Sequence, residues 1–391
     1  MVHEFCQRAQ QSEVWFEVTA HGRELRTGQR PMRKHDRRRS RRGTLSRWLV
    51  ALLCLPLALA CGRTSAPPSA VPSVQEGPKV GVTELRFEDT ARKRPLATRI
   101  WYPADPETVV RERSFDGVFI SHSAHNAELA STPAQFPLVL MSHGTGGSSS
   151  SMVWIAEYLA AHGYLVAAVE HFGNTFRNNS PEGFIAVWRR PVDISRVLDA
   201  LLTEPRFGKR IAVNRIGAAG FSAGGYTVIA LAGGIYHPEL MGIYSREHPT
   251  EKGNKLARAI DFSRIPDIAS ASLSYRDERI RAVFAMAPAL GPGFETADLA
   301  QIRIPVGVVA SVQDDWLPLA ANAQHFAESI PGAKLTQLPA GGHFIFMPLC
   351  NAYGSQYAHE ICTDIDPSID RKAIHEQVQK LALDFFDRHL Q

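Results

Sequence analysis

The sequence predicts an α/β protein built on a doubly wound, mainly parallel sheet. Apolar runs of strand length alternate with helical segments from about residue 80 to the end of the 391-residue chain. Several runs are continuously apolar, as expected of strands buried on both faces, and Pro137–Gly144 is the clearest of them. Strands that alternate with helices over this length favour parallel neighbours joined by crossover helices.

The expected elements follow one another along the chain. Two half-exposed strands come first, because apolar and polar residues alternate there, and the polar stretch 104–137 is expected to hold little regular structure. The expected strands are Val82–Asp89, Leu96–Pro103, Pro137–Gly144, Tyr164–His171, Arg215–Phe221, Arg281–Pro288, Ile304–Asp315 and Lys334–Leu338, and the expected helices are Met152–His162, Asp193–Thr203, a helix from Tyr226, Leu319–Ile330 and Arg371–His389. The segment of about 235–279 is charged and lacks a buried-strand run, so we predict an inserted cap within a domain that spans 80–391.

Positive charge is concentrated at the N-terminal end of the chain. Residues 1–61 contain 12 Lys and Arg against 5 Asp and Glu, a net charge of +7. The whole chain has a formal net charge of +4, so residues 62–391 carry −3. The basic character belongs to the leader, and the composition therefore gives no support for a nucleic-acid partner.

Residues 32–60 have the pattern of a signal peptide. A basic n-region precedes the 13 uncharged apolar residues Trp48–Ala60, which are too few to span a bilayer. Cys61 follows small residues as in a bacterial lipoprotein signal, and 61–79 would form a flexible Ser/Pro-rich tether. We expect an exported protein that is anchored to a membrane through Cys61, or a soluble secreted one if Cys61 is not lipidated. Residues 1–31 do not fit in front of a signal peptide, so we expect Met32 to be the true start, with a genuine N-terminal extension as the alternative.

Two cysteines, Cys350 and Cys362, lie in the body of the chain. In an exported domain they are a candidate disulfide, which would close the loop that follows His343. Two separate buried thiols are the alternative.

Gly220, Ser222 and Gly224 have the spacing G-x-S-x-G, between an apolar strand and a helix. Such a strand–turn–helix holds its serine in a strained conformation, and small neighbours let the turn close. The turn lifts the hydroxyl above the sheet, so Ser222 is a candidate nucleophile. A glycine-rich turn with an idle serine is the alternative.

A serine needs a base within hydrogen-bond reach and an acid that orients the base. Asp314 and Asp315 follow one expected strand, and His343 follows the next in a glycine-rich loop. Sites in open parallel sheets lie at the carboxyl ends of the strands, where these side chains would meet Ser222. The order serine, aspartate, histidine predicts a Ser222–Asp314–His343 triad; taken singly, each residue could equally be a turn former or an idle loop residue.

The loop His143–Gly147 follows an early buried strand and is a candidate oxyanion hole. The mechanism needs one backbone N–H from the residue after the serine, Ala223, and a second from such a loop, for which Thr145 is the candidate. We expect His143 to hold this loop rather than act as a base. His122, His125 and His171 lack partners at metal-ligand spacing, so no metal or other cofactor is expected.

These stretches carry a family resemblance. Those beginning at Pro137, Tyr164, Arg190, Gly220 and Pro331 resemble the bacterial predicted dienelactone-hydrolase group of α/β-hydrolases, itself similar to plasma-type platelet-activating-factor acetylhydrolases. The resemblance implies a serine esterase whose oxyanion hole uses Thr145 and Ala223, and it favours Asp314 over Asp315. Dienelactone hydrolases use a cysteine nucleophile, whereas this chain has Ser222. The name of the group therefore does not indicate the substrate of this protein.

The function that the sequence predicts is hydrolysis of carboxylic esters, with short-chain acyl or phospholipid-type substrates, through an acyl-enzyme. The alternatives are an amidase or peptidase on the same triad and a catalytically idle, anchored binding lipoprotein. The expected partners are a small-molecule or lipid ester and, through the leader, a membrane; the sequence does not indicate an oligomeric state. Six aromatic residues are candidates for an acyl pocket or for ordinary core: Trp154, Phe172, Phe176, Trp188, Phe294 and Trp316.

Overall fold

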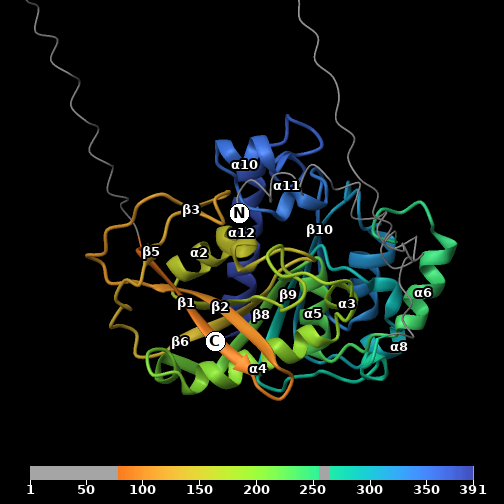
Figure 1. Ribbon diagram of the computed structural model, residues 1–391, viewed down its shortest axis with the longest axis horizontal. Helices are drawn as coiled ribbons and strands as arrows, with labels where there is room; N and C mark the ends of the chain where they lie inside the picture. The colour runs from red at the N-terminus through yellow and green to blue at the C-terminus, as the bar shows by residue number, and fades with distance from the viewer. Residues whose placement is uncertain (1–77, 255–264, 391) are drawn as a thin grey trace, which may run out of the picture. The chain divides into compact units, whose positions relative to one another are not determined.

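The computed structural model describes residues 78–254 and 265–390 (Figure 1). The interpretations of 1–31 as an extension, of 32–60 as a signal peptide and of Cys61 as a lipidation site lie outside the described residues, as does nearly all of the tether 61–79. None of the helices in the described ranges combines the length and the hydropathy that a bilayer crossing needs.

A nine-stranded sheet forms the centre of the fold, in the order β11-β10-β9-β8-β6-β7-β2-β1-β5. Its strands are β1 (Val80–Asp89), β2 (Arg94–Pro103), β5 (Ala124–His125), β6 (Phe136–Ser142), β7 (Leu165–Val169), β8 (Ile211–Phe221), β9 (Ile280–Met286), β10 (Val306–Ser311) and β11 (Lys334–Leu338). Six neighbouring strands pair in parallel, in the order β11, β10, β9, β8, β6 and β7. The β1–β2 hairpin joins β7 antiparallel through β2. The α/β class and the mainly parallel sheet predicted from the sequence are confirmed.

The order of the strands places a topological switch point between β6 and β8. From β6 the chain moves to β7 on one side, and it then returns to β8 on the other side of β6. Segments that leave the carboxyl ends of β6 and β8 therefore diverge over a crevice, which is where open parallel sheets bind ligands.

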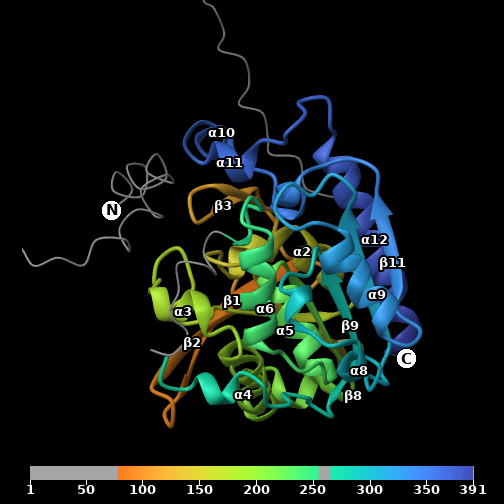
Figure 2. The ribbon, with the colours of Figure 1, turned by 90° about the vertical axis from the view of Figure 1, so that its right-hand side faces the viewer.

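Helices cover both faces of the sheet, because the central strands are apolar on both sides. The cluster on one face includes residues of α4, α5 and α9, and the cluster on the other includes residues of α2 and α12. Figure 2 shows α9 and α12 beside the β11 edge. The longer helices are α2 (Val153–Ala161), α4 (Arg189–Thr203), α5 (Ala223–Ala232), α6 (Pro238–Glu247) and α12 (Arg371–His389), and the shorter ones are α3 (Pro181–Ile185), α8 (Thr296–Leu299), α9 (His325–Ser329), α10 (Ala352–Tyr357) and α11 (His359–Cys362).

Two expected elements differ from the structure. The stretch 104–137 contains β5 and a small antiparallel pair, β3 (Arg113–Phe115) and β4 (Phe119–Ser121). Strands of two or three residues are too short to be recognised from the alternation of apolar and polar residues. The expected helix Leu319–Ile330 is split into a π-helical turn at Ala320–Gln324 and α9.

The segment predicted as a cap runs from the end of α5 to β9. Its described part contains α6 and a 3₁₀ turn at Ile268–Ser270, and it contains no strand longer than a single bridge, at Tyr236. Residues 255–264 lie outside the described ranges, and the division into domain and cap stays a prediction.

Candidate active site

Ser222 lies at the sharp turn between β8 and α5, with φ 56° and ψ −116°. This is a sparsely populated conformation for a residue with a side chain, and it costs about 1–3 kcal/mol. Backbone hydrogen bonds from the Ser222 N–H to the Met286 carbonyl, at 2.9 Å, and from the Ala289 N–H to the Ser222 carbonyl, at 3.0 Å, hold the turn against β9. The half-buried hydroxyl is thereby presented at the carboxyl end of the sheet.

The small residues around Ser222 are required by close backbone contacts. A Cβ on Gly220 would lie 2.1 Å from the Gly224 carbonyl oxygen, and a Cβ on Gly224 would lie 1.8 Å from the Ser142 carbonyl oxygen. On Gly225 it would lie 2.6 Å from the Cα of Pro288. The glycine spacing noted in the sequence thus packs α5 against the ends of β6 and β9.

His343 and Asp314 meet Ser222 from two later loops. The Nε2 atom of His343 lies 3.0 Å from the Ser222 Oγ, and its Nδ1 lies 2.8 Å from Oδ2 of Asp314. The Asp314 Oδ1 accepts hydrogen bonds from the backbone N–H groups of Trp316 and Leu317, at 2.9 and 2.8 Å. Because a carboxylate can only accept, the Nδ1 of His343 carries the proton and Nε2 is free to accept the serine proton.

Asp315 has a different task from that of its neighbour. Its Oδ1 accepts from the His343 backbone N–H at 3.1 Å, and its Oδ2 accepts from Lys252 of the predicted cap segment at 2.5 Å. Burial acts to raise the pKa of Asp315, but the bonds from Lys252 and from the His343 N–H outweigh burial and lower the pKa. Asp315 therefore fixes the loop that carries His343, while Asp314 faces the imidazole.

Apolar rings surround the imidazole of His343. The rings of Phe221 and Phe344 lie 4.9 and 5.5 Å from it, centroid to centroid, and that of Trp316 lies 6.4 Å away. The side chains of His343 and Asp314 retain only 5% and 2% of their exposure. Water is thus excluded from the hydrogen bond that would orient the base, which strengthens it.

The loop after β6 lies beside the turn that carries Ser222. A Cβ on Gly144 would stand 3.4 Å from the Ser222 Cβ, so the loop approaches the nucleophile closely. Thr145 is exposed, and within the described residues neither its N–H nor that of Ala223 donates a hydrogen bond. Both amides are available to an oxyanion formed at Ser222.

His143 supports this loop. Its Nδ1 lies 2.7 Å from the Gly144 carbonyl, and its Nε2 accepts from the backbone N–H of His171. Burial lowers the pKa of His143 well below its usual value, and the charge of Arg190 acts in the same direction. A neutral, buried imidazole of fixed tautomer is suited to holding the loop, as expected from the sequence, and not to accepting the serine proton.

A cavity of about 410 Å³ opens over Ser222, and its walls are largely apolar. One wall comes from the segment before β9, including Tyr236, Met241 and Tyr244, and a second comes from Phe176 and Phe184. Further lining residues are Val118, Phe119, Leu290, Pro292, Leu317, Phe344, Met347 and Ile361. A volume of this size can hold a drug-sized ligand.

The aromatic candidates for the acyl pocket divide between cavity and core. Phe176 and Trp316 line the cavity. Trp188 and Phe294 are buried in the core, and Trp154 stacks on His375 with its indole N–H bonded to the Phe346 carbonyl. The remaining candidate, Phe172, is 38% exposed at the surface.

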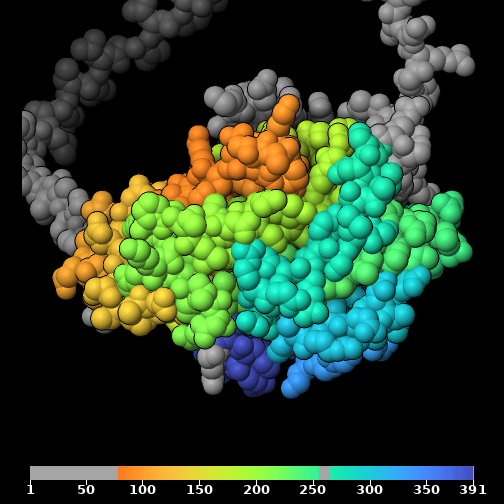
Figure 3. All heavy atoms as spheres, turned by 90° about the horizontal axis from the view of Figure 1, so that it is seen from below, coloured from red at the N-terminus to blue at the C-terminus, as the bar shows by residue number. Residues whose placement is uncertain are grey.

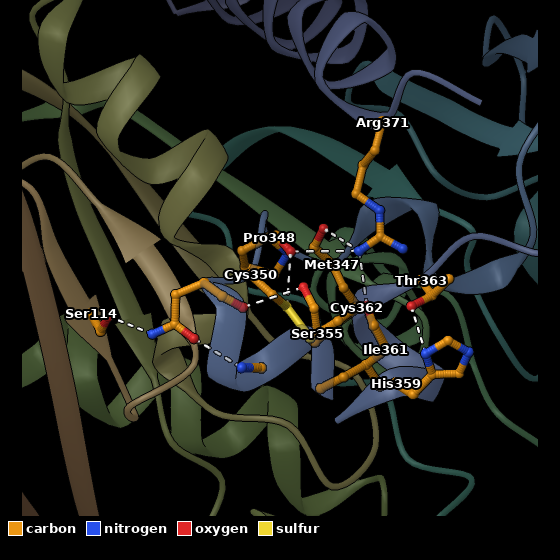
Figure 4. The surroundings of a disulfide bond; sticks show 12 residues. Ser114, Met347, Pro348, Cys350, Ser355, His359, Ile361, Cys362, Thr363 and Arg371 are labelled. Carbon is orange, nitrogen blue, oxygen red and sulfur yellow. Dashed lines mark hydrogen bonds between the residues drawn. A yellow bond between two sulfur atoms is a disulfide. The ribbon is translucent and has the colours of Figure 1, made fainter. Parts of the chain in front are cut away.

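Cys350 and Cys362 form a disulfide (Figure 4). The bridge closes the segment that carries α10 and α11, between the His343 loop and α12. Arg371 of α12 donates to the Ile361 carbonyl at 2.8 Å and holds this segment from the other side. Because Met347 and Ile361 line the cavity, the bridge stabilises one of its walls.

The three histidines considered as metal ligands do not come together. The ring of His125 packs on Phe115, whereas the backbone N–H of His122 bonds to Glu157. His171 is buried beside Ser142. A group not apparent from the sequence, His237, Glu295 and Asp298, brings three potential ligand atoms within 4.8 Å of one another, and His237 is hydrogen-bonded to Asp298 at 2.7 Å.

Two comparisons with known proteins find similarities. Residues 113–176 match the family model for platelet-activating factor acetylhydrolase, isoform II. A solved structure, the ferulic acid esterase from Streptomyces cinnamoneus, is 21% identical with a TM-score of 0.56, and the alignment covers 83% of this chain and 92% of that chain. A comparison with curated protein sequences finds no match. The α/β-hydrolase fold and the resemblance to platelet-activating-factor acetylhydrolases, which the sequence predicted, are confirmed.

Proposed function

We propose that this chain is a serine-dependent hydrolase of carboxylic esters that works through an acyl-enzyme. The observation that carries the proposal is the hydrogen-bonded row from Ser222 through His343 to Asp314 at the base of an apolar cavity. Similarity to a platelet-activating factor acetylhydrolase model and to a ferulic acid esterase supports the ester class.

The geometry suggests the following course of reaction. The Nε2 of His343 takes the Ser222 proton as the hydroxyl attacks the ester carbonyl, and Asp314 stabilises the imidazolium. The Ala223 and Thr145 N–H groups donate to the developing oxyanion. His343 returns the proton to the leaving alcohol, and water then hydrolyses the acyl-enzyme by the same steps in reverse roles.

We propose substrates whose acyl part is apolar and does not exceed the cavity. The cavity of about 410 Å³ is larger than an acetyl group alone requires, and its walls carry many apolar and aromatic side chains. Short acyl chains and the acyl groups of phospholipid-type esters both satisfy this requirement. No cofactor or metal takes part in the proposed reaction.

The first test is hydrolysis of p-nitrophenyl esters from C2 to C16, with the matching anilides alongside. We expect turnover of the esters, with a loss on the order of 10⁶-fold in kcat in Ser222→Ala, the extent seen when the nucleophile of a serine hydrolase is removed. Faster turnover of anilides than of esters would make the chain an amidase. If no ester or anilide is turned over and a fluorophosphonate leaves Ser222 unlabelled, the chain is a binding protein.

We also propose that the enzyme is exported and acts at a membrane through a lipid on Cys61, or as a soluble secreted form. The disulfide between Cys350 and Cys362 supports export, because such bonds persist in oxidising compartments. Expression with radiolabelled palmitate tests the anchor. Label and membrane association should both be lost in Cys61→Ser, and a soluble, unlabelled parent protein would favour the secreted form.

A further inference from the structure

Contacts to the Gly144 carbonyl fix the orientation of the Thr145 N–H, which belongs to the same peptide group. In a planar trans peptide the N–H points opposite to the C=O. The Gly144 carbonyl accepts from the His143 Nδ1 at 2.7 Å, from the Gly147 N–H at 3.2 Å and from an Arg190 Nη at 3.4 Å. All three donors hold the carbonyl, so the Thr145 N–H is directed away from them.

Arg190, on α4, is placed to control this peptide. Its side chain is buried, with 2% relative exposure of the residue, and its other Nη donates to the His143 carbonyl at 2.6 Å. One guanidinium thus binds two successive carbonyls of the oxyanion loop. We propose that Arg190 is a positioning residue of the oxyanion hole, which holds the Gly144–Thr145 peptide so that its N–H faces the reacting carbonyl. This inference rests on the proposed function.

Arg190 has no carboxylate within ion-pair distance in the described part of the chain, and its Nε has no hydrogen-bond partner there. A buried charge without a direct ion pair is costly even though the Asp193 carboxylate acts on it from a distance, so its retention calls for a function. Here the positive charge is bound to the carbonyl ends of two successive peptide dipoles of the oxyanion loop. The same charge would favour negative charge on a bound oxyanion.

A second buried row keeps the support rigid. The Nε2 of His171 lies 2.9 Å from the Ser142 Oγ, and its Nδ1 lies 3.1 Å from Asp193, which also accepts a bidentate pair of bonds from Arg94. Burial raises the pKa of Asp193, but the bonds from His171 and Arg94 outweigh it and lower the pKa to about 2. Ser142 and His171 have no exposure, so this row cannot reach a substrate and serves the loop.

The row is connected to the surface of the molecule through α4. Arg92, in the turn of the β1–β2 hairpin, donates to Asp193 and to the Arg189 carbonyl. Figure 3 shows the light green atoms of this region bordered by the orange hairpin and by the teal segment before β9. These contacts join the first turn of α4, which carries Arg190, to the β1–β2 hairpin.

The test separates transition-state binding from ground-state binding. Arg190→Met, Arg190→Lys and the unsubstituted chain are compared for kcat and KM on a p-nitrophenyl ester. They are also compared for the affinity of a trifluoromethyl ketone, which forms an oxyanion on serine, and of an inert ether of the same shape. For Arg190→Met we expect kcat/KM and ketone affinity to fall together by roughly 10- to 100-fold, less than the roughly 100- to 1,000-fold that deleting a hole donor costs. KM and ether affinity should change less than threefold, and Arg190→Lys should recover part of the loss.

Arg206→Met is the matched control. Arg206 is half-buried, and its guanidinium donates to the Ala127 carbonyl and to the Tyr102 hydroxyl, outside the residues that line the cavity. It should change each quantity less than threefold.

Full kcat/KM in folded Arg190→Met, or equal losses of ketone and ether affinity, would contradict the inference. If Arg190→Met does not fold, Arg190→Lys must show the same split between ketone and ether, or the inference fails. An unsubstituted chain that neither hydrolyses the ester nor binds the ketone would mean instead that the proposed function has failed.

Discussion

Replacing Asp314 by asparagine should remove nearly all activity while leaving the fold intact. The Oδ1 position accepts from the N–H groups of Trp316 and Leu317, so an asparagine will place its carbonyl oxygen there. Its NH₂ group then faces the Nδ1 of His343, which lies 2.8 Å from Oδ2 in the present structure. Nδ1 becomes an acceptor, the proton moves to Nε2, and the imidazole can no longer take the proton of Ser222.

The magnitude follows from the tautomer. A wrong tautomer in a serine hydrolase lowers kcat by about 10,000-fold. At about 1.4 kcal/mol per factor of ten, the loss corresponds to about 5.5 kcal/mol of transition-state stabilisation. The assay is kcat on a p-nitrophenyl ester, with thermal unfolding measured on the same sample to show that the fold is retained.

The adjacent aspartate is the matched control. Asp315→Asn keeps an oxygen for the His343 backbone N–H and loses only the charge toward Lys252, so kcat should fall less than tenfold. If Asp314→Asn retains activity within tenfold of the parent, or if Asp315→Asn loses as much, the assignment of the acid is wrong.

Three further predictions concern stability. Gly224→Ala should lower the free energy of unfolding by roughly 3 kcal/mol or more, because its Cβ would overlap the Ser142 carbonyl. His375 is buried, and burial lowers its pKa to about 4, below its unfolded value of about 6.5. The free energy of unfolding is therefore highest above pH 6.5, and about 3 kcal/mol of it should be lost as the pH falls to 4. His375→Gln should not show this loss. Cys350→Ser opens a loop with a sequence separation of 12 and should lower the free energy of unfolding by about 3 kcal/mol.

Each of these has a control and a contrary result. Gly242→Ala, in α6, meets only the end of Arg246 at 3.5 Å and should raise stability by about 1 kcal/mol, so equal effects at 224 and 242 would contradict the packing argument. For His375, urea unfolding at pH 7 and at pH 4 should give a smaller difference in the variant than in the parent; parallel curves would show that the imidazole is not buried neutral. For Cys350→Ser, unfolding of the reduced parent is the comparison, and the two should agree.

The central strands and the meeting of the Ser222, His343 and Asp314 side chains could be predicted because local pattern and position in the fold coincide there. The run Pro137–Gly144 is apolar throughout since β6 is buried on both faces, and β11 and α12 begin and end at the residues expected. The chain order of Ser222, Asp314 and His343 sufficed to predict that their side chains meet, because parallel strands bring their carboxyl ends to one edge of the sheet.

The buried polar network could not be predicted by the same reasoning. The expected helix began at Asp193, whereas α4 begins at Arg189 and buries both Arg190 and Asp193. Hydrophobic periodicity assigns charged residues to the exposed face, and it fails where their partners come from other strands, as Arg94 and His171 do here. The aromatic candidates could not be divided between core and cavity for a related reason, since the pattern that predicts burial does not say whether a ring meets core or cavity.

Trapping the acyl-enzyme shows whether Ser222 is the nucleophile of an ester hydrolase. The full chain is mixed with a p-nitrophenyl ester, quenched in acid within the first turnover and digested for mass spectrometry. We expect one acyl group on the peptide that contains Ser222, and none in Ser222→Ala. Ester hydrolysis at an undiminished rate in Ser222→Ala, or an acyl group on another residue of the parent chain, would contradict it.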